Sequence, residues 1–352
     1  MQFQETVEAV RDKRMTAPVH IRIKPINHCN HNCWYCAYRA DQLQLGEEMD
    51  LKDKIPEDKM FEIVEDIIQM GVKAVTFSGG GEPLIYRSIP EIIERLAAGG
   101  VKVGALSNGT NLKGRMADAF AHHATWIRVS MDGWDNASYA KSRGVKEGEF
   151  DRIISNLRTF AERNSNCTLG VSFIVSNDNS GHILEMCKML KDVGANHVKL
   201  AAAVVSNDVH ENNQYHRKIM NLVTEQIDDA AKLNDETFTV LNHYHEAEER
   251  FEKTYETCPF LSFLTVIGAD QTVYSCQDKA YNANGALGSI KNRRFKDFWF
   301  SDENHERVFG LNPSIVCRHH CVAHSKNIAL FNHLKNPTEA PTDIEKDHAL
   351  FV

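Results

Sequence analysis

The sequence predicts an α/β fold, a partial (β/α)6 barrel followed by a small cysteine-rich domain. β-rich runs alternate with amphipathic helical runs as far as about residue 235, as in successive βα units around a parallel sheet. Beyond that point the alternation stops and the pieces become short. Seven of the nine cysteines form two groups, one early and one late in the chain. Six βα repeats are too few for the eight of a closed barrel.

The first strand is predicted at residues 19–26, and its helix runs from Pro56, a favourable residue in a first helical turn, to Gly71 as its stop. The later strands are expected at 72–78, 101–107, 126–131, 169–175 and 198–202, and their helices at 89–98, near Met116, 150–163, 183–190 and 215–233. A hairpin at 263–276 and a short helix in RFKDFW follow. We therefore expect a core at 1–240, an auxiliary domain at 241–335, and a tail at 336–352 that is a mobile end or a lid.

Composition sets the protein class. The chain has 352 residues, 42% of them hydrophobic and 25% charged, which is typical of a folded soluble enzyme. Its apolar runs are too short to span a membrane, and the polar amino terminus lacks the features of a secretory signal, so we expect a cytoplasmic protein without a membrane partner. The net charge of −8 and the scattered basic residues argue against nucleic acid as a partner.

A cysteine motif, NHCNHNCWYCAYR, directly follows the first predicted strand. Its three thiolates, Cys29, Cys33 and Cys36, can bind three irons of a cubane cluster. The fourth iron is then left without a protein ligand, and an open position on a metal is where substrate chemistry occurs. A zinc site with His28 or His31 as the fourth ligand is the alternative.

This motif resembles that of the radical S-adenosylmethionine (radical SAM) superfamily. The family has an aromatic residue just before the third cysteine, and Tyr35 stands at that position in this sequence. One βα unit later, FSGGGEPL brings Gly80, Gly81 and Glu82 into the position of the family's GGEP motif. The resemblance implies a [4Fe–4S] cluster that binds S-adenosylmethionine (SAM) at its open iron, with Glu82 holding the α-amino group of the methionine moiety. Taken alone, GGGEP is also compatible with a simple turn.

Polar residues at two further strand ends extend the resemblance. Ser107 and Asn108, in SNGT, are similar to the family's group that meets the ribose. Ser130, in SMDG, and Arg143 are similar to residues of the subgroup with auxiliary clusters, and the resemblance implies that they contact the methionine carboxylate. For each residue the alternative is a helix cap, a turn or an exposed charge.

The second cysteine group comprises Cys258, Cys276, Cys317 and Cys321, and its setting resembles the SPASM/Twitch extension of radical SAM enzymes. Four cysteines can ligate one cubane fully, so one auxiliary [4Fe–4S] cluster is expected. Gln271 departs from the pattern, because the family commonly has glycine there. The alternative is a structural zinc, held by all four cysteines or by three of them with a histidine, namely His319, His320 or His324. Cys167 and Cys187 are interpreted as ordinary core residues.

The resemblance implies an enzyme that cleaves SAM reductively to a 5′-deoxyadenosyl radical, supplied with electrons by a donor such as flavodoxin or ferredoxin. A fully ligated auxiliary cluster favours electron acceptance, and hence a two-electron oxidation such as alcohol to ketone. Only 28 residues precede Cys29, too few for a leader-binding domain, so a small polar substrate such as a sugar or aminocyclitol is expected. The alternatives are a peptide maturase and a non-catalytic iron–sulfur electron-transfer protein. Candidate pocket residues are Tyr38, Arg39, His210, Tyr215 and His216.

Overall fold

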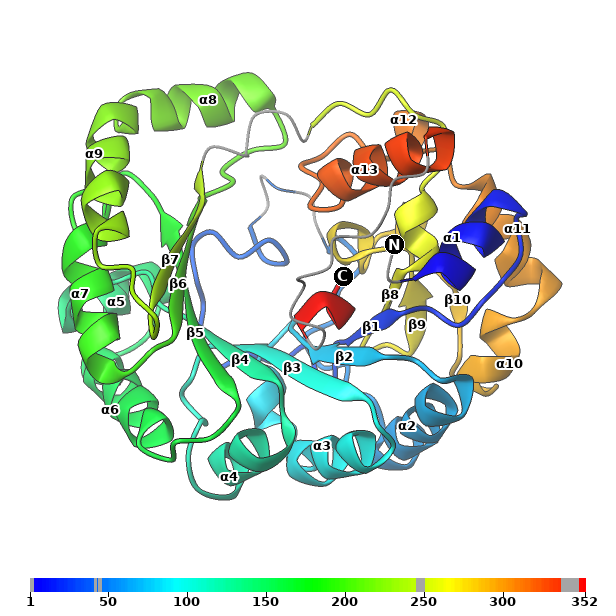
Figure 1. Ribbon diagram of the computed structural model, residues 1–352, viewed down its shortest axis with the longest axis horizontal. Coiled ribbons are helices and arrows are strands. Elements are labelled where there is room, and N and C mark those ends of the chain that lie inside the picture. Colours follow the sequence, from blue (N-terminus) through cyan, green and yellow to red (C-terminus); the bar gives the residue numbers. More distant parts are fainter. Residues whose placement is uncertain (1–2, 41–42, 44–45, 245–250, 337–347) are drawn as a thin grey trace.

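The computed structural model describes residues 3–40, 43, 46–244, 251–336 and 348–352. One ten-stranded sheet runs through this part of the chain, in the order β10-β9-β8-β1-β2-β3-β4-β5-β6-β7. Seven consecutive strands pair in parallel and curve into an open barrel with helices on its outside (Figure 1). They are β1 (His20–Ile23), β2 (Ala74–Phe77), β3 (Lys102–Ser107), β4 (Trp126–Ser130), β5 (Thr168–Val175), β6 (His197–Ala202) and β7 (Thr239–His243).

The predicted hairpin is present and joins this same sheet. β8 (Leu264–Ile267) pairs in parallel with β1, and β9 (Thr272–Tyr274) and β10 (Ala286–Ser289) continue antiparallel beyond it. The cysteine-bearing C-terminal segment is therefore attached to the first strand of the barrel. Its division from the core as a separate domain stays a prediction.

The outer helices are α2 (Glu57–Met70), α3 (Ile89–Ala98), α4 (Gly114–His123), α5 (Asn136–Arg143), α6 (Glu149–Ala161), α7 (Ile183–Val193), α8 (Val209–Arg217) and α9 (Met220–Ala231). α1 (Gln4–Arg11) precedes the barrel, and α10 (Phe295–Trp299), α11 (Asp302–Gly310), α12 (Pro313–Val316) and α13 (His324–Lys335) follow it. Pro56 caps α2, and Gly71 ends it with φ of 74°, the left-handed conformation that glycine adopts readily.

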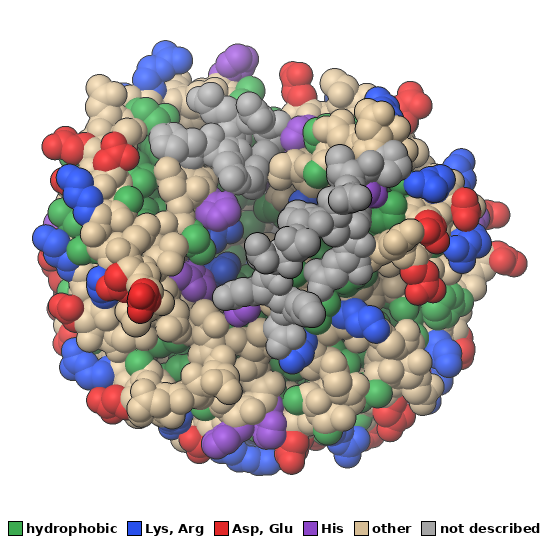
Figure 2. Space-filling model, viewed as in Figure 1, with side chains coloured by type: hydrophobic (Ala, Val, Ile, Leu, Met, Phe, Trp, Pro, Cys, Tyr) green, Lys and Arg blue, Asp and Glu red, His purple; other side chains and the backbone are tan. Residues whose placement is uncertain are grey.

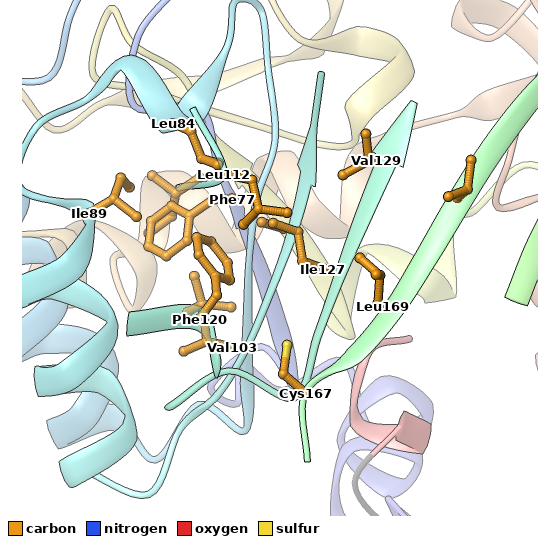
Figure 3. Close-up of a cluster of buried hydrophobic side chains, with 14 of the residues drawn as sticks. Phe77, Leu84, Ile89, Val103, Leu112, Phe120, Ile127, Val129, Cys167 and Leu169 are labelled. Carbon is orange, nitrogen blue, oxygen red and sulfur yellow. The ribbon is translucent and has the colours of Figure 1, made fainter. Parts of the chain in front are cut away.

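The hydrophobic core lies between the strands and the outer helices. Every second strand residue faces it, including Phe77 of β2, Val103 of β3 and Ile127 of β4, which pack against Phe120 of α4 and its neighbours (Figure 3). Cys167 and Cys187 are buried in this core, as predicted. The alternate strand residues face the inside of the barrel.

Two elements differ from the prediction. The helix expected at 215–233 is two helices, α8 and α9, separated at Lys218 and Ile219, where the β-branched Ile219 packs against the core. β7 was not predicted, and it crosses the expected boundary between residues 240 and 241. Its sequence, TVLNH, is short and gives little alternation. Among the described residues, no helix is long and apolar enough to cross a membrane.

The last five residues lie inside the barrel, at the amino ends of its strands (Figure 1). The Phe351 ring packs edge-on against His20 of β1 and Trp126 of β4, with centroids 5.6 and 5.3 Å away. His20 Nδ1 lies 3.0 Å from the Val352 oxygen. The predicted tail is thus a floor for the barrel over residues 348–352, and its remainder at 337–347 lies outside the described residues.

Gln271, where the family commonly has glycine, lies in the β8–β9 turn with φ of +64°. This conformation is strained for a residue with a Cβ, so Gln271→Gly should raise the free energy of unfolding by about 0.5 kcal/mol. In the exposed helix α8, where glycine costs about 1 kcal/mol, Gln214→Gly should lower it. Chemical denaturation of the two variants measures whether each substitution raises or lowers the free energy of unfolding. A loss of stability in both would contradict the strain argument.

Candidate active site

The first cysteine group occupies the loop between β1 and α2, at the carboxyl end of the parallel strands. The Cys36 N–H donates to the Cys33 carbonyl at 3.2 Å, and the Cys29 sulfur accepts a hydrogen bond from the His31 N–H at 3.4 Å. Burial raises the pKa of the Cys29 thiol to about 11 and that of Cys36 above its usual value. These thiols therefore need the positive charge of a metal to ionise and act as ligands.

His31 ties the cysteine loop to the strand ends. Burial lowers its pKa to about 3, so the ring is neutral. Its Nε2 lies 3.2 Å from the Thr110 hydroxyl, which in turn donates to Glu149 at 2.8 Å. Nε2 therefore carries the proton and donates. His28, the other proposed zinc ligand, is exposed. Among the described residues, no three His, Cys, Asp or Glu side chains lie close enough to hold a single metal ion.

The glycine run after β2 packs directly on the cysteine loop. The Gly81 N–H donates to Ile26 and the Glu82 N–H to His28, at 3.1 and 3.0 Å. A Cβ on Gly81 would lie 2.0 Å from the His28 carbonyl oxygen, and one on Gly80 would lie 2.3 Å from Asn27 Oδ1. Gly81 is required because the two backbones approach so closely, and at Gly80 the Asn27 side chain occupies the space of a Cβ.

The Glu82 carboxylate is almost completely buried beside this loop, 3% exposed. It accepts hydrogen bonds from Ser107 Oγ at 2.7 Å, the Asn108 N–H at 2.7 Å and the Leu84 N–H at 3.0 Å. Burial raises its pKa, and these donors oppose the rise. The structure thus brings together three predicted site residues, and Ser107 and Asn108 hold Glu82 directly. Asn108 also reaches the cysteine loop, donating to Asn30 at 2.7 Å.

The predicted Arg143 lies at the other side of the loop. Its Nη1 donates to the Cys33 sulfur at 3.3 Å, and Nη2 forms a buried ion pair with Asp132 at 2.6 Å. The Tyr35 hydroxyl also donates to Asp132. Asp132 was noticed in the sequence only as part of a signature, yet it joins two site residues. Ser130 ends β4 on the barrel's inner face, half-buried.

The second cysteine group is also assembled by the fold. Cys276, which follows β9, interacts electrostatically with Cys321, Cys317 and Cys258. Burial raises the pKa of Cys258 to about 11 and that of Cys321 to about 12. These four soft thiols, of which Cys321 is buried and the other three are half-buried, are the ligand type that suits an iron–sulfur cluster. In the described part of the chain they do not lie close enough together to hold a single zinc ion.

Two residues near these cysteines were missed from the sequence. The Asn327 amide, on α13, donates to the Cys258 sulfur at 3.4 Å. Lys253 interacts electrostatically with Cys321, Cys317 and Cys276. Such donors and cations are suited to anionic sulfur ligands. Of the proposed zinc-binding histidines, His319 is buried and its Nε2 has no hydrogen-bond partner in the described part of the chain, whereas His324 Nδ1 lies 3.2 Å from Tyr255.

Lys24 and Tyr38 connect the two cysteine groups. The Lys24 ammonium donates to the Tyr38 hydroxyl at 2.7 Å and to the Gly79 carbonyl at 2.6 Å. Tyr38, two residues after Cys36, donates in turn to the carbonyl of Gln277, the residue after Cys276, at 3.0 Å. The two groups therefore border one region at the carboxyl ends of β1 and β8.

The other candidate pocket residues are dispersed. Arg39 donates to the His31 carbonyl at 2.9 Å and so supports the cysteine loop. His216 lines a cavity of about 120 Å³ beyond β6, where it contacts Ala203 and Tyr244. His210 is exposed, and the Tyr215 hydroxyl accepts the Asn177 N–H at 3.2 Å. Only Tyr38 of this set lies between the cysteine groups in the described part of the chain.

Residues 23–190 match the family model described as the Radical SAM superfamily. A GTP 3′,8-cyclase of Xanthomonas campestris is 28% identical over 177 residues, covering 49% of this chain and 51% of the relative. An S-adenosylmethionine-dependent nucleotide dehydratase of Lacinutrix mariniflava is 31% identical over 113 residues, covering 32% of this chain and 23% of the relative. The chain thus spans about half, or less, of the length of these curated relatives.

Solved structures resemble almost the whole chain. Streptococcus suis SuiB bound to its precursor peptide SuiA superposes with a TM-score of 0.63 at 16% identity, covering 95% of this chain and 77% of SuiB. The enzyme anSMEcpe with bound AdoMet gives a TM-score of 0.58 at 14% identity, covering 91% and 98%. At these identities the likeness establishes the fold, the partial barrel predicted from the sequence.

Proposed function

We propose that this chain, whose residues 23–190 match the Radical SAM superfamily, is a radical SAM enzyme that oxidises a small polar metabolite by two electrons. Cys29, Cys33 and Cys36 hold the [4Fe–4S] cluster with the open iron for SAM. When both are bound, that pair supplies a 5′-deoxyadenosyl radical, which removes a hydrogen atom from a substrate carbon. An external donor such as flavodoxin or ferredoxin supplies the electron.

The buried Glu82 carboxylate is the observation that carries this proposal. Glu82 is fixed by Ser107 and Asn108 and joined through its N–H to the cysteine loop at His28. A buried anion held beside a cluster loop is placed to receive an ammonium group, as the α-amino group of SAM requires. Electron transfer alone needs no such carboxylate, which disfavours the non-catalytic alternative.

The second cysteine group supports oxidation. We propose that Cys258, Cys276, Cys317 and Cys321 hold one auxiliary [4Fe–4S] cluster in a SPASM/Twitch-like domain at 241–335. Four protein ligands leave no open iron, which favours electron acceptance over substrate binding. Tyr38 and Gln277 join the two cysteine groups through a hydrogen bond at 3.0 Å, so a substrate between them would be near both.

The substrate that we propose is a small polar molecule. A sugar or aminocyclitol remains our leading candidate, and the names of the cyclase and the nucleotide dehydratase are consistent with a small molecule. The precursor peptide bound to SuiB favours the second candidate, a peptide maturase. The reconstituted protein, incubated anaerobically with SAM and dithionite, should release 5′-deoxyadenosine and methionine. A reconstituted cluster that produced neither would favour the electron-transfer protein.

Metal analysis tests the two sets of ligands. Anaerobically reconstituted protein should contain about eight irons and eight sulfides per chain, from two cubane clusters. Replacing Cys29, Cys33 and Cys36 together should leave about four of each. Stoichiometric zinc in protein purified without reconstitution would contradict the auxiliary cluster and assign the second group to a structural zinc.

A further inference from the structure

Three cationic side chains face the inside of the barrel. Ile21 and Ile23 of β1 pack in the outer core, so Arg22 of β1 and Lys24, which directly follows the strand, point inward. On β4, Ile127 and Val129 are core residues, and Arg128 between them points inward as well. Arg22 and Arg128 interact electrostatically although two strands separate β1 from β4. The curvature of the sheet therefore brings these cations toward one another.

Their partners are mostly neutral. Lys24, 0% exposed, donates to a tyrosine hydroxyl and a backbone carbonyl. Arg128 Nε donates at 3.2 Å to the ring of His197, which is neutral because burial lowers its pKa to about 4. Arg22 Nε is buried and has no hydrogen-bond partner among the described residues.

One carboxylate, Asp278, faces Arg22 and Lys24. Its Oδ2 already accepts the Val322 N–H at 3.0 Å. The other acidic groups that face Arg22 and Lys24 are the thiols of Cys36 and Cys276 and the phenol of Tyr38, whereas Arg128 interacts with Arg22. Burial and the charge of Arg22 lower the pKa of Lys24 to about 7, and burial lowers that of Arg22 too. Buried like charges are unfavourable unless a bound anion compensates them.

The position of the cations suits a substrate. Below them, Phe351 and Val352 close the barrel against His20 and Trp126. Above them lie the two cysteine groups, since Arg22 interacts with Cys276 and Lys24 with both Cys36 and Cys276. Figure 2 shows the face of the molecule on which the C-terminal residues lie, with a hollow near its middle where histidine and basic side chains are visible.

We propose that Arg22, Lys24 and Arg128 bind an oxyanion of the substrate, a phosphate or a carboxylate, and that the enzyme acts on an anionic metabolite. A guanidinium presents a planar pair of donors that matches two oxygens of such a group. This inference rests on the proposed function and narrows its substrate class. A free aminocyclitol, which is cationic, would be repelled from this site, whereas a sugar phosphate or a sugar acid would be attracted.

Isothermal titration of the reconstituted, SAM-loaded protein tests the site, with inorganic pyrophosphate and succinate as probes. We expect at least one probe to bind, and Arg22→Gln and Arg128→Gln each to weaken it about tenfold or more. Arg158→Gln, the same change at an exposed position on α6, should leave binding unaltered. Binding of pyrophosphate alone assigns a phosphate, binding of succinate alone a carboxylate, and binding of both an unselective oxyanion site.

Stability gives a second readout. Arg22→Gln removes a buried charge, so without added anion its melting temperature should equal or exceed that of the wild type. A lower melting temperature with unchanged anion binding would assign Arg22 to a structural pair with Asp278 and overturn the proposal. Wild-type protein that forms 5′-deoxyadenosine but binds neither probe would also overturn it, leaving the proposed function intact. Protein that binds a probe but does not cleave SAM would support the anion site and overturn the proposed function.

Discussion

Cys33→Ala should abolish the formation of 5′-deoxyadenosine from SAM. Cys33 is one of three proposed ligands of the cluster with the open iron, and its sulfur also accepts the hydrogen bond from Arg143. Losing one of three ligands destabilises the site where SAM would chelate. The measurement is chromatography of the anaerobic reaction with dithionite, with the iron content determined on the same sample.

Cys187→Ala is the matched control for this variant. Cys187 lies on α7, is 0% exposed and faces the hydrophobic core. Removing it should cost about 1 kcal/mol of folding free energy and leave SAM cleavage unchanged. A Cys33→Ala protein that still cleaved SAM at the wild-type rate would show that another residue completes the ligand set.

Cys276→Ala should separate the two halves of the reaction. If the auxiliary cluster accepts the electron from the substrate, its loss should leave 5′-deoxyadenosine formation within about threefold of wild type. Product formation should fall about 100-fold, equivalent to ~2.7 kcal/mol in the barrier. Both products are quantified in one anaerobic assay with the substrate.

Folding linkage complicates this comparison, because β8 and β9 are part of the barrel sheet and Cys276 directly follows them. Loss of the metal there could loosen the first site as well. Variants that are monodisperse and keep about four irons exclude this effect. If such a variant converted the substrate at the native rate, the auxiliary metal would be structural and the proposed oxidation would lose its main support.

The barrel was predictable because local signals and tertiary packing agree. The helix expected at 89–98 is α3 (Ile89–Ala98), where apolar residues recur on one face. The β8–β9 hairpin was also predicted, but its pairing with β1 was not, since register between distant strands leaves no local signal. β7 was missed because an edge strand of five residues shows too little alternation to be distinguished from a loop.

For the site, motifs identified the residues but not their partners. Glu82 was assigned from GGEP, whereas its bonds to Ser107 and Asn108 depend on how two strands end side by side. The cations at Arg22 and Lys24 did carry a signal. Arg22 stands between Ile21 and Ile23, which are both buried. A charged residue at such a position of a barrel strand is predicted to point into the barrel.

The placement of Phe351 and Val352 under the barrel bears on how the protein can be handled. A peptide joined to Val352 would start next to His20, beside the place where Phe351 packs against His20 and Trp126. An affinity tag or reporter fused to Val352 would therefore disturb the packing of residues 348–352 against the strands. Immobilisation through a lysine on an outer helix, such as the exposed Lys232 after α9, leaves the interior untouched.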